Sequence, residues 1–110
     1  MQTRDFTYVS NVVDANLLAL FTANPAALNR VCNIGGGEEI SIRHLFKAVC
    51  RLAGVHLEPV YREVRAGDVR HSIADISLAR EVLGYRPGVG VEEGLERVWQ
   101  WMEACAEVPS

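Results

Sequence analysis

The spacing of apolar residues along the chain changes between a period of two and a period near 3.6, and each change marks a predicted element. Residues 4–9, RDFTYV, begin with charge and then alternate as a short strand does. Residues 30–34 form a second apolar run, which three glycines end. A third run, LEPVYREV at 57–64, contains a proline and is predicted as an edge strand or a strand start.

Helical spacing fills the intervals between these runs. Residues 11–21 are predicted as a helix that Ser10 caps, because a serine hydroxyl can accept a hydrogen bond from a backbone N–H at a helix start. Residues 42–52 form the strongest amphipathic pattern in the chain. We expect Ser41 to cap this second helix and Gly54 to end it.

Two further helices are predicted after the third strand. Asp75 is expected to cap a short helix that ends at Gly84, and a last helix carries one apolar stripe between residues 91 and 105. The order strand, helix, strand, helix, strand, helix, helix is typical of an α/β fold. Three short strands make a thin sheet with two exposed edges, which native proteins usually cover. We therefore expect the chain to be the end of a larger α/β protein.

Composition and charge narrow the possible function classes. The 110 residues fit one small domain, with 49% hydrophobic and 23% charged residues, as in globular proteins. The formal net charge of -3 disfavours nucleic acid as a partner, because binding the phosphate backbone requires a basic face. No apolar run reaches ~18 residues and the N-terminus has no signal-peptide core, so we expect no membrane partner.

The cysteines and histidines form no disulfide or metal pattern. Cys32, Cys50 and Cys105 are odd in number and have no C-x-x-C spacing, which indicates a reducing compartment and predicts a cytoplasmic protein. The three histidines are scattered and include no H-x-x-x-H pair, so no zinc site is predicted.

The segment GGGEEIS at 35–41 joins a predicted strand to a predicted helix, as a phosphate-binding loop does. It matches neither G-x-G-x-x-G nor a P-loop that ends in G-K-[ST]. Glu38 and Glu39 stand where a phosphate would approach, and two carboxylates repel an anion. The preferred interpretation is a flexible turn before a capped helix.

A more highly charged connector, RAGDVRHSIAD, occupies residues 65–75. The planar fork of Arg65 would match two phosphate oxygens, and the carboxylate of Asp68 could accept two hydrogen bonds from a ribose diol. The small residues between them would let a ligand approach the backbone. The residues alone leave two interpretations open: a clamp for a nucleotide diphosphate, and a surface ion pair that contributes little.

Four motifs, from Thr3 to about Met102, resemble in order and spacing the C-terminal third of a nucleotide-sugar epimerase. They are RDFTYVSNVVDAN, VCNIGGGEEISIRHL, RAGDVRHSIADISLAREVLGYRP and VEEGLERVWQW. The family that they resemble is the extended short-chain dehydrogenases, which include UDP-glucose and UDP-N-acetylglucosamine 4-epimerases and dTDP-glucose dehydratases. The motifs are specific for this superfamily and less specific for the substrate.

The resemblance implies that four residues bind a UDP-linked sugar. Arg4, in the R-D-[FY] motif, and Arg65, which opens R-x-G-D, match arginines that contact the nucleotide diphosphate. Asp68 matches the aspartate that bonds the ribose. Ser72 matches a position bordering the sugar pocket, where a small residue admits N-acetyl sugars, so a pocket that accepts an N-acetylhexosamine is expected.

The same resemblance implies that the chemistry depends on groups outside this sequence. The family binds NAD through a glycine-rich βαβ unit and uses a Ser or Thr with a Tyr-x-x-x-Lys pair. Lys47 is the only lysine here, and no tyrosine precedes it by four residues. We therefore expect no catalytic residue, no NAD bound by this chain alone, and no turnover. The expected protein partner is an N-terminal cofactor domain or a second copy of the chain.

The resemblance also predicts how the α/β chain is divided. Residues 1–38 would supply the last strands of a Rossmann-type sheet, residues 39–106 a small mixed α/β substrate-binding lobe, and residues 107–110 a tail. The leading hypothesis is the substrate-binding portion of an NAD-dependent nucleotide-sugar 4-epimerase that acts on a UDP-hexose or a UDP-N-acetylhexosamine. Two alternatives stay open: a non-catalytic nucleotide-sugar binding module or half of a split enzyme, and a ligand-free structural α/β domain.

Overall fold

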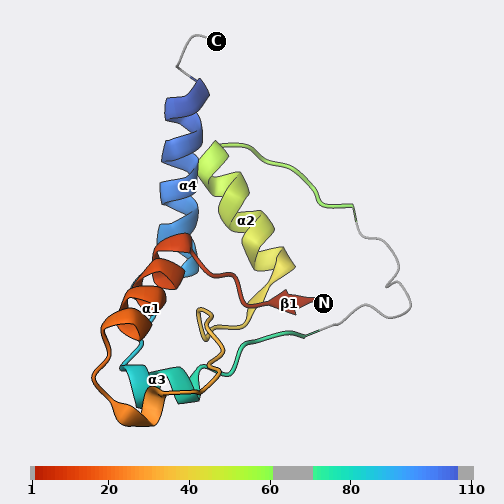
Figure 1. Ribbon diagram of the computed structural model, residues 1–110. Coiled ribbons are helices and arrows are strands. Elements are labelled where there is room, and N and C mark those ends of the chain that lie inside the picture. The colour runs from red at the N-terminus through yellow and green to blue at the C-terminus, as the bar shows by residue number, and fades with distance from the viewer. Residues whose placement is uncertain (1, 61–70, 107–110) are drawn as a thin grey trace.

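The computed structural model describes residues 2–60 and 71–106, which form a mixed α/β arrangement of helices and a short two-stranded antiparallel sheet (Figure 1). The elements in chain order are β1 (Thr3–Arg4), α1 (Val9–Phe21), the 3-10 helix η1 (Pro25–Ala27), β2 (Ile40–Ser41), α2 (Ile42–Ala53), α3 (Ser77–Leu83) and α4 (Val91–Ala106). The predicted α/β class is confirmed. None of the helices in these two ranges combines the length and apolarity that a bilayer crossing requires.

The sheet is the main departure from the predicted elements. β1 pairs antiparallel with β2, so that Thr3 lies opposite Ser41 and Arg4 opposite Ile40. Of the predicted first strand, 4–9, only Arg4 lies in β1. Residues 30–34 and 57–60 form no strand. An extended run becomes a strand only where a neighbour completes its hydrogen bonds, and the described residues offer these runs none. The rest of the third predicted strand, 61–64, lies outside the described residues.

The amphipathic helix α2 is bounded as predicted. The Ser41 hydroxyl accepts a hydrogen bond from the His44 N–H at 3.0 Å, which satisfies one free donor of the first turn. Gly54 takes a left-handed conformation with φ of 68°, and its N–H donates to the Arg51 carbonyl at 3.3 Å. In Figure 1, α2 lies beside the long helix α4, and the two pack together.

The predicted cap of α1 is wrong, and that of α3 is displaced by one residue. α1 begins at Val9 with Tyr8 as its N-cap, so Ser10 lies inside the first turn, where its hydroxyl is buried without a hydrogen-bond partner among the described residues. Ile76 is the N-cap of α3, yet the Asp75 carboxylate accepts from the Ser77 N–H at 3.0 Å and from its hydroxyl at 2.5 Å. These bonds lower the pKa of Asp75.

A small core joins α1 and α3 to the segment between η1 and β2. Its fully buried members are Ala15, Ile76, Ala79 and Tyr85, with Cys32, Ile34, Ala74 and Leu83 packed against them. Much of the apolar surface of α1 remains exposed, since Leu20 and Phe21 are 72% and 77% accessible. The core therefore packs α1, α3 and the segment between η1 and β2 against one another, while the outer side of α1 stays exposed.

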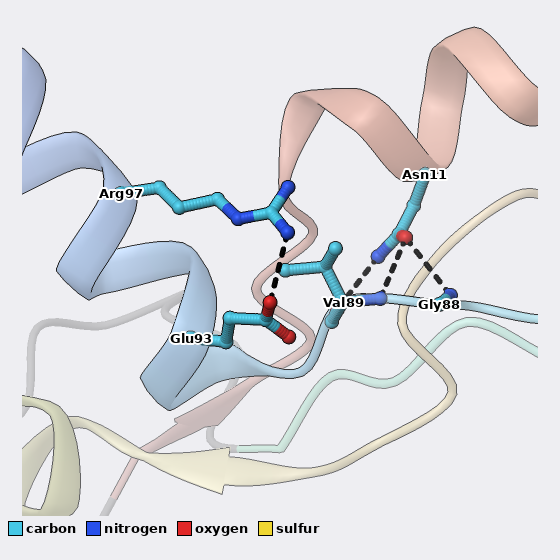
Figure 2. Close-up of polar contacts among 5 residues, drawn as sticks. All are labelled: Asn11, Gly88, Val89, Glu93 and Arg97. Atoms are coloured by element: carbon cyan, nitrogen blue, oxygen red, sulfur yellow. Dashed lines mark hydrogen bonds and ion pairs between the residues drawn. The ribbon is translucent and has the colours of Figure 1, made fainter.

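Asn11 connects the start of α1 to the turn before α4 (Figure 2). Its side-chain N–H donates to the Val89 carbonyl at 2.8 Å, and its oxygen accepts from the N–H groups of Gly88 and Val89 at 3.1 Å each. The amide is 1% accessible, so each of these bonds satisfies a group that water does not reach. Figure 2 also shows Arg97 and Glu93 paired on the neighbouring helix at 2.8 Å.

Candidate functional site

Arg4 and Ser72, two of the four predicted substrate-binding residues, line the same hollow although they lie far apart in the sequence. The hollow has a volume of about 570 Å³ and is open to solvent on one side. Its wall is formed by Arg4, Asp5, Thr7, Asn33, Ile34, Gly35, Ser72, Ile73, Ala74 and Asp75. The other two predicted residues, Arg65 and Asp68, lie outside the described residues.

Arg4 comes from β1 and is half-buried, and its Nη1 donates a hydrogen bond to the carbonyl of Thr3 at 2.6 Å. That bond uses one of the five N–H donors of the guanidinium. The donors that remain, together with the permanent positive charge, suit an anionic ligand in the hollow. Ser72 lines the same hollow from an exposed segment and contributes a small side chain.

Asp5 is the residue that holds the walls of this hollow together. Its carboxylate accepts hydrogen bonds from the N–H groups of Gly36 at 2.8 Å, Gly37 at 3.0 Å and Ala74 at 3.2 Å. The hydroxyl of Thr7 donates to the same carboxylate at 3.3 Å and accepts from Gly36 at 3.1 Å. One side chain thus joins the N-terminal segment, the glycine turn and the segment that carries Ser72.

The glycines of the turn are needed for this close approach. A Cβ added to Gly35 would lie 2.8 Å from the Cβ of Ala74 and 2.8 Å from the Asp5 carboxylate. A Cβ on Gly36 would lie 3.0 Å from the carboxylate and 3.1 Å from the carbonyl of Phe6. The interpretation of 35–41 as a flexible turn is therefore incomplete, because its glycines form an anion-binding nest that is occupied by a carboxylate of the same chain.

Tyr85 closes the inner side of the turn. Its hydroxyl donates to the Gly35 carbonyl at 2.7 Å, and its ring is fully buried. Burial raises the pKa of the phenol, and the negative charges of Asp5 and Asp14 raise it further. The hydroxyl therefore stays protonated as a hydrogen-bond donor, which makes Tyr85 a support of the glycine turn.

A second polar cluster borders β1. The Thr3 hydroxyl donates to Glu39 and also lies 2.9 Å from Nδ1 of His71, which is itself 2.9 Å from the Glu39 carboxylate. The hydrogen bond from Thr3, more than the nearby His71, lowers the pKa of Glu39. Sequence reasoning did not identify this cluster or the role of Asp5. The one available signal was the position of Asp5, directly beside the predicted Arg4.

The described lining of the hollow combines polar, charged and apolar side chains and includes neither a tyrosine nor a lysine. The described residues bring no three metal-ligating side chains together. The glycine turn does not fit a dinucleotide, because the sequence lacks G-x-G-x-x-G and the N–H groups that a phosphate would use already bind Asp5. A larger hollow of about 600 Å³ beside α2, lined by Arg43, Lys47 and Arg51 among others, contains none of the predicted site residues.

Comparison with known proteins gives a consistent family. Residues 1–98 match the family model described as GDP-mannose 4,6 dehydratase. Over 102 residues the chain is 40% identical to a putative UDP-glucose 4-epimerase of Methanocaldococcus jannaschii, which covers 93% of this chain and 32% of the relative. It is also 40% identical over 95 residues to a UDP-glucose 4-epimerase of Mycolicibacterium smegmatis, covering 86% of this chain and 29% of that protein.

Solved structures agree with these relatives. The crystal structure of a Thermotoga maritima UDP-glucose 4-epimerase with UDP-glucose is 42% identical and superposes with a TM-score of 0.84, over 96% of this chain and 33% of that one. A Bacillus cereus UDP-glucuronic acid 4-epimerase in complex with UDP-glucuronic acid and NAD is 31% identical, with a TM-score of 0.82, over 94% of this chain and 33% of that chain. The chain thus spans about a third of the length of the relatives it matches.

Proposed function

The chain belongs to the NAD-dependent nucleotide-sugar epimerase and dehydratase family of extended short-chain dehydrogenases, and we propose that it forms the substrate-binding wall of a nucleotide-sugar 4-epimerase. The substrate class is a UDP-hexose or a UDP-N-acetylhexosamine. Arg4 and Arg65 bind the diphosphate, Asp68 binds the ribose, and Ser72 borders the sugar. The observation that carries this proposal is that Arg4 and Ser72 line one hollow.

The chemistry of the hollow supports a nucleotide sugar as the ligand. Arg4 offers a positive, multiply donating group to an anion, and Ser72 offers a small, polar boundary. The ligands named for the Thermotoga and Bacillus structures, UDP-glucose and UDP-glucuronic acid, both combine a diphosphate with a hexose. A small residue at 72 leaves room for an N-acetyl group, which favours N-acetylhexosamines among the possible sugars.

The division of labour within the chain is part of the proposal. Residues 1–38 serve the side that meets a cofactor-binding part, and residues 39–106 form the substrate lobe. Support comes from the apolar surface of the first region, where Phe21 is 77% and Val31 91% accessible. Apolar side chains at that exposure gain free energy when another polypeptide surface covers them. The partner of this side would carry the NAD site and the Tyr-x-x-x-Lys pair.

Activity of the chain by itself is not part of the proposal, because its sequence contains no Tyr-x-x-x-Lys pair. Purified chain mixed with NAD and UDP-glucose is expected to produce no UDP-galactose. Formation of UDP-galactose above the rate of a blank would contradict this expectation.

Titration of the chain with UDP, UDP-glucose and UDP-N-acetylglucosamine tests the binding role. Two-dimensional amide spectra should show ligand-dependent shifts at Arg4 and Ser72, with the sugar adding shifts at Ser72 that UDP alone does not cause. Unchanged spectra at millimolar UDP and UDP-sugar would favour a ligand-free structural domain.

Arg65→Ala provides a sharper test of the proposed diphosphate contact. Loss of a charge-assisted, bidentate contact should weaken UDP binding by ~2 kcal/mol or more. The matched control is Arg30→Ala, which removes an arginine that the structure shows exposed, outside the lining of the hollow. Isothermal titration of both variants with UDP makes the comparison, and equal affinities would identify Arg65 as an ordinary surface charge.

A further inference from the structure

The cluster of Thr3, Glu39 and His71 joins three separate segments beside the candidate site. Thr3 belongs to β1, Glu39 precedes β2, and His71 opens the segment that leads to α3. Two contacts of 2.9 Å converge on Nδ1 of His71, one from Thr3 Oγ1 and one from the Glu39 carboxylate, and the Thr3 hydroxyl also bonds that carboxylate. The three side chains therefore contact one another as a closed set.

The chemistry of Glu39 fixes the directions of these hydrogen bonds. Its pKa is lowered, first by the bond from Thr3, so the group is an ionised carboxylate that only accepts. The Thr3 hydroxyl then donates to it, and the Nδ1–H of His71, whose nitrogen lies 2.9 Å from both the carboxylate and Thr3 Oγ1, is shared between these two oxygens. Because both partners meet the imidazole at Nδ1, the ring does not bridge them through its two nitrogens as in a nucleophile–His–acid relay. The cluster is accordingly suited to holding segments in place.

The cluster lies next in sequence to both described site residues. Thr3 precedes Arg4, and His71 precedes Ser72. The segment of Ser72 has a second attachment two residues later, where the Ala74 N–H donates to Asp5 at 3.2 Å. Ser72 is thus held between a side-chain contact on one side and a backbone contact on the other.

Because the cluster is exposed, its contacts can position neighbouring residues while contributing little to the stability of the fold. The side chains of His71 and Glu39 are 61% and 42% accessible, and ion pairs at such exposure add little to folding stability. An equally exposed pair, His44 with Glu92 at 3.5 Å, joins α2 to α4 away from the hollow. Removal of either pair should leave the fold intact, yet only one of them adjoins the site.

We propose that Thr3, Glu39 and His71 form a clasp that sets the position of Ser72 relative to Arg4 in the wall of the hollow. His71 and Thr3 are positioning residues, which act through their neighbours and do not touch the ligand. This inference rests on the proposed function for its consequence, a correctly spaced diphosphate and sugar contact, but the clasp itself is a property of the ligand-free chain.

Amide spectra of ligand-free variants test the clasp, with each readout placed away from the substitution. Thr3→Val, which removes the hydroxyl and keeps the shape, should shift the amide of Ser72. His71→Ala should shift the amide of Arg4. Thr3→Ser and His71→Asn keep a donor at the same place and should return both signals close to their original positions. His44→Ala is the matched control and should move neither. Unmoved Ser72 and Arg4 signals in Thr3→Val and His71→Ala would overturn the inference.

Binding of UDP-glucose supplies an independent readout. His71→Ala and Thr3→Val should raise its Kd about tenfold with only a small loss of thermal stability, while the Kd values of His71→Asn, Thr3→Ser and His44→Ala should stay within about twofold of the original chain. If the variants lost as much unfolding free energy as binding free energy, the cluster would act on folding, and the positioning role would be overturned. Shifted amides in a chain that binds no UDP-sugar would uphold the clasp and contradict the proposed function.

Discussion

Two carboxylates hold the segment of Ser72 to the N-terminal strand, and they do so in different ways. Asp5 accepts from three backbone N–H groups, two in the glycine turn and one at Ala74. Among the described residues, Glu39 accepts from two side chains, those of Thr3 and His71, and it is exposed. Backbone donors at the first carboxylate are fixed by the fold, whereas side-chain donors at the second can leave without breaking it. The same segment thus has a structural attachment and an adjustable one.

The largest effect is expected at Asp5. Asp5→Ala removes the acceptor of the Gly37 and Ala74 N–H groups and one of the two acceptors of the Gly36 N–H in a half-buried place, which should lower the free energy of unfolding by about 3 kcal/mol. Glu39→Ala should cause a much smaller loss because water can replace its bonds. Asp14→Ala, which removes an exposed acid on α1, is the control. Urea denaturation measures all three, and a loss at Glu39 equal to that at Asp5 would remove the distinction between the two carboxylates.

The next effect tests whether the glycine turn fits around Asp5. Gly35→Ala places a methyl group 2.8 Å from both Ala74 Cβ and the Asp5 carboxylate, so the turn or its neighbours must move. A loss of about 2 kcal/mol is expected from such overpacking. Gly88→Ala makes the same chemical change where no atom lies within 4 Å of the added Cβ, and it should change the free energy of unfolding far less. Similar losses of unfolding free energy in the two variants would show that the turn can accommodate the added methyl group.

The comparison also shows which features the sequence could predict. Local chemistry determined the boundaries of α2, where Ser41 and Gly54 act within a few residues of their own positions. The strand at 30–34 was wrong because strand formation depends on a neighbour, and apolar alternation alone does not provide one. The cap at Ser10 was wrong because the N-cap lies two residues earlier, at Tyr8, which no capping pattern indicates.

In the candidate site too, features set by local sequence were predicted, and features set by distant contacts were not. Arg4 and Ser72 were predicted from motifs, and the structure brings both to one hollow. Asp5 and the clasp were missed because their partners are 31 to 69 residues away, and such contacts follow from the folded chain rather than from spacing. The pattern of three glycines did suggest an anion-binding turn, and the sequence disfavoured a phosphate as its ligand. It did not identify the anion that the turn binds. That anion is Asp5.

The smallest expected effect is a pH-dependent contribution of Glu39 to the melting temperature. The pKa of Glu39 lies below its ordinary value of 4.5 in the folded chain, so ionised Glu39 stabilises the fold above about pH 4.5. That contribution is lost as the pH falls through the folded-state pKa. Melting temperatures of the original chain and Glu39→Gln should therefore differ at pH 6 and converge toward pH 3. Because Asp75 also has a lowered pKa, Asp75→Asn must be measured in parallel, and its difference should be independent of Glu39. A constant gap between the original chain and Glu39→Gln across this range would mean that Thr3 and His71 do not favour the ionised carboxylate, and the clasp would then lack the charge that orients its donors.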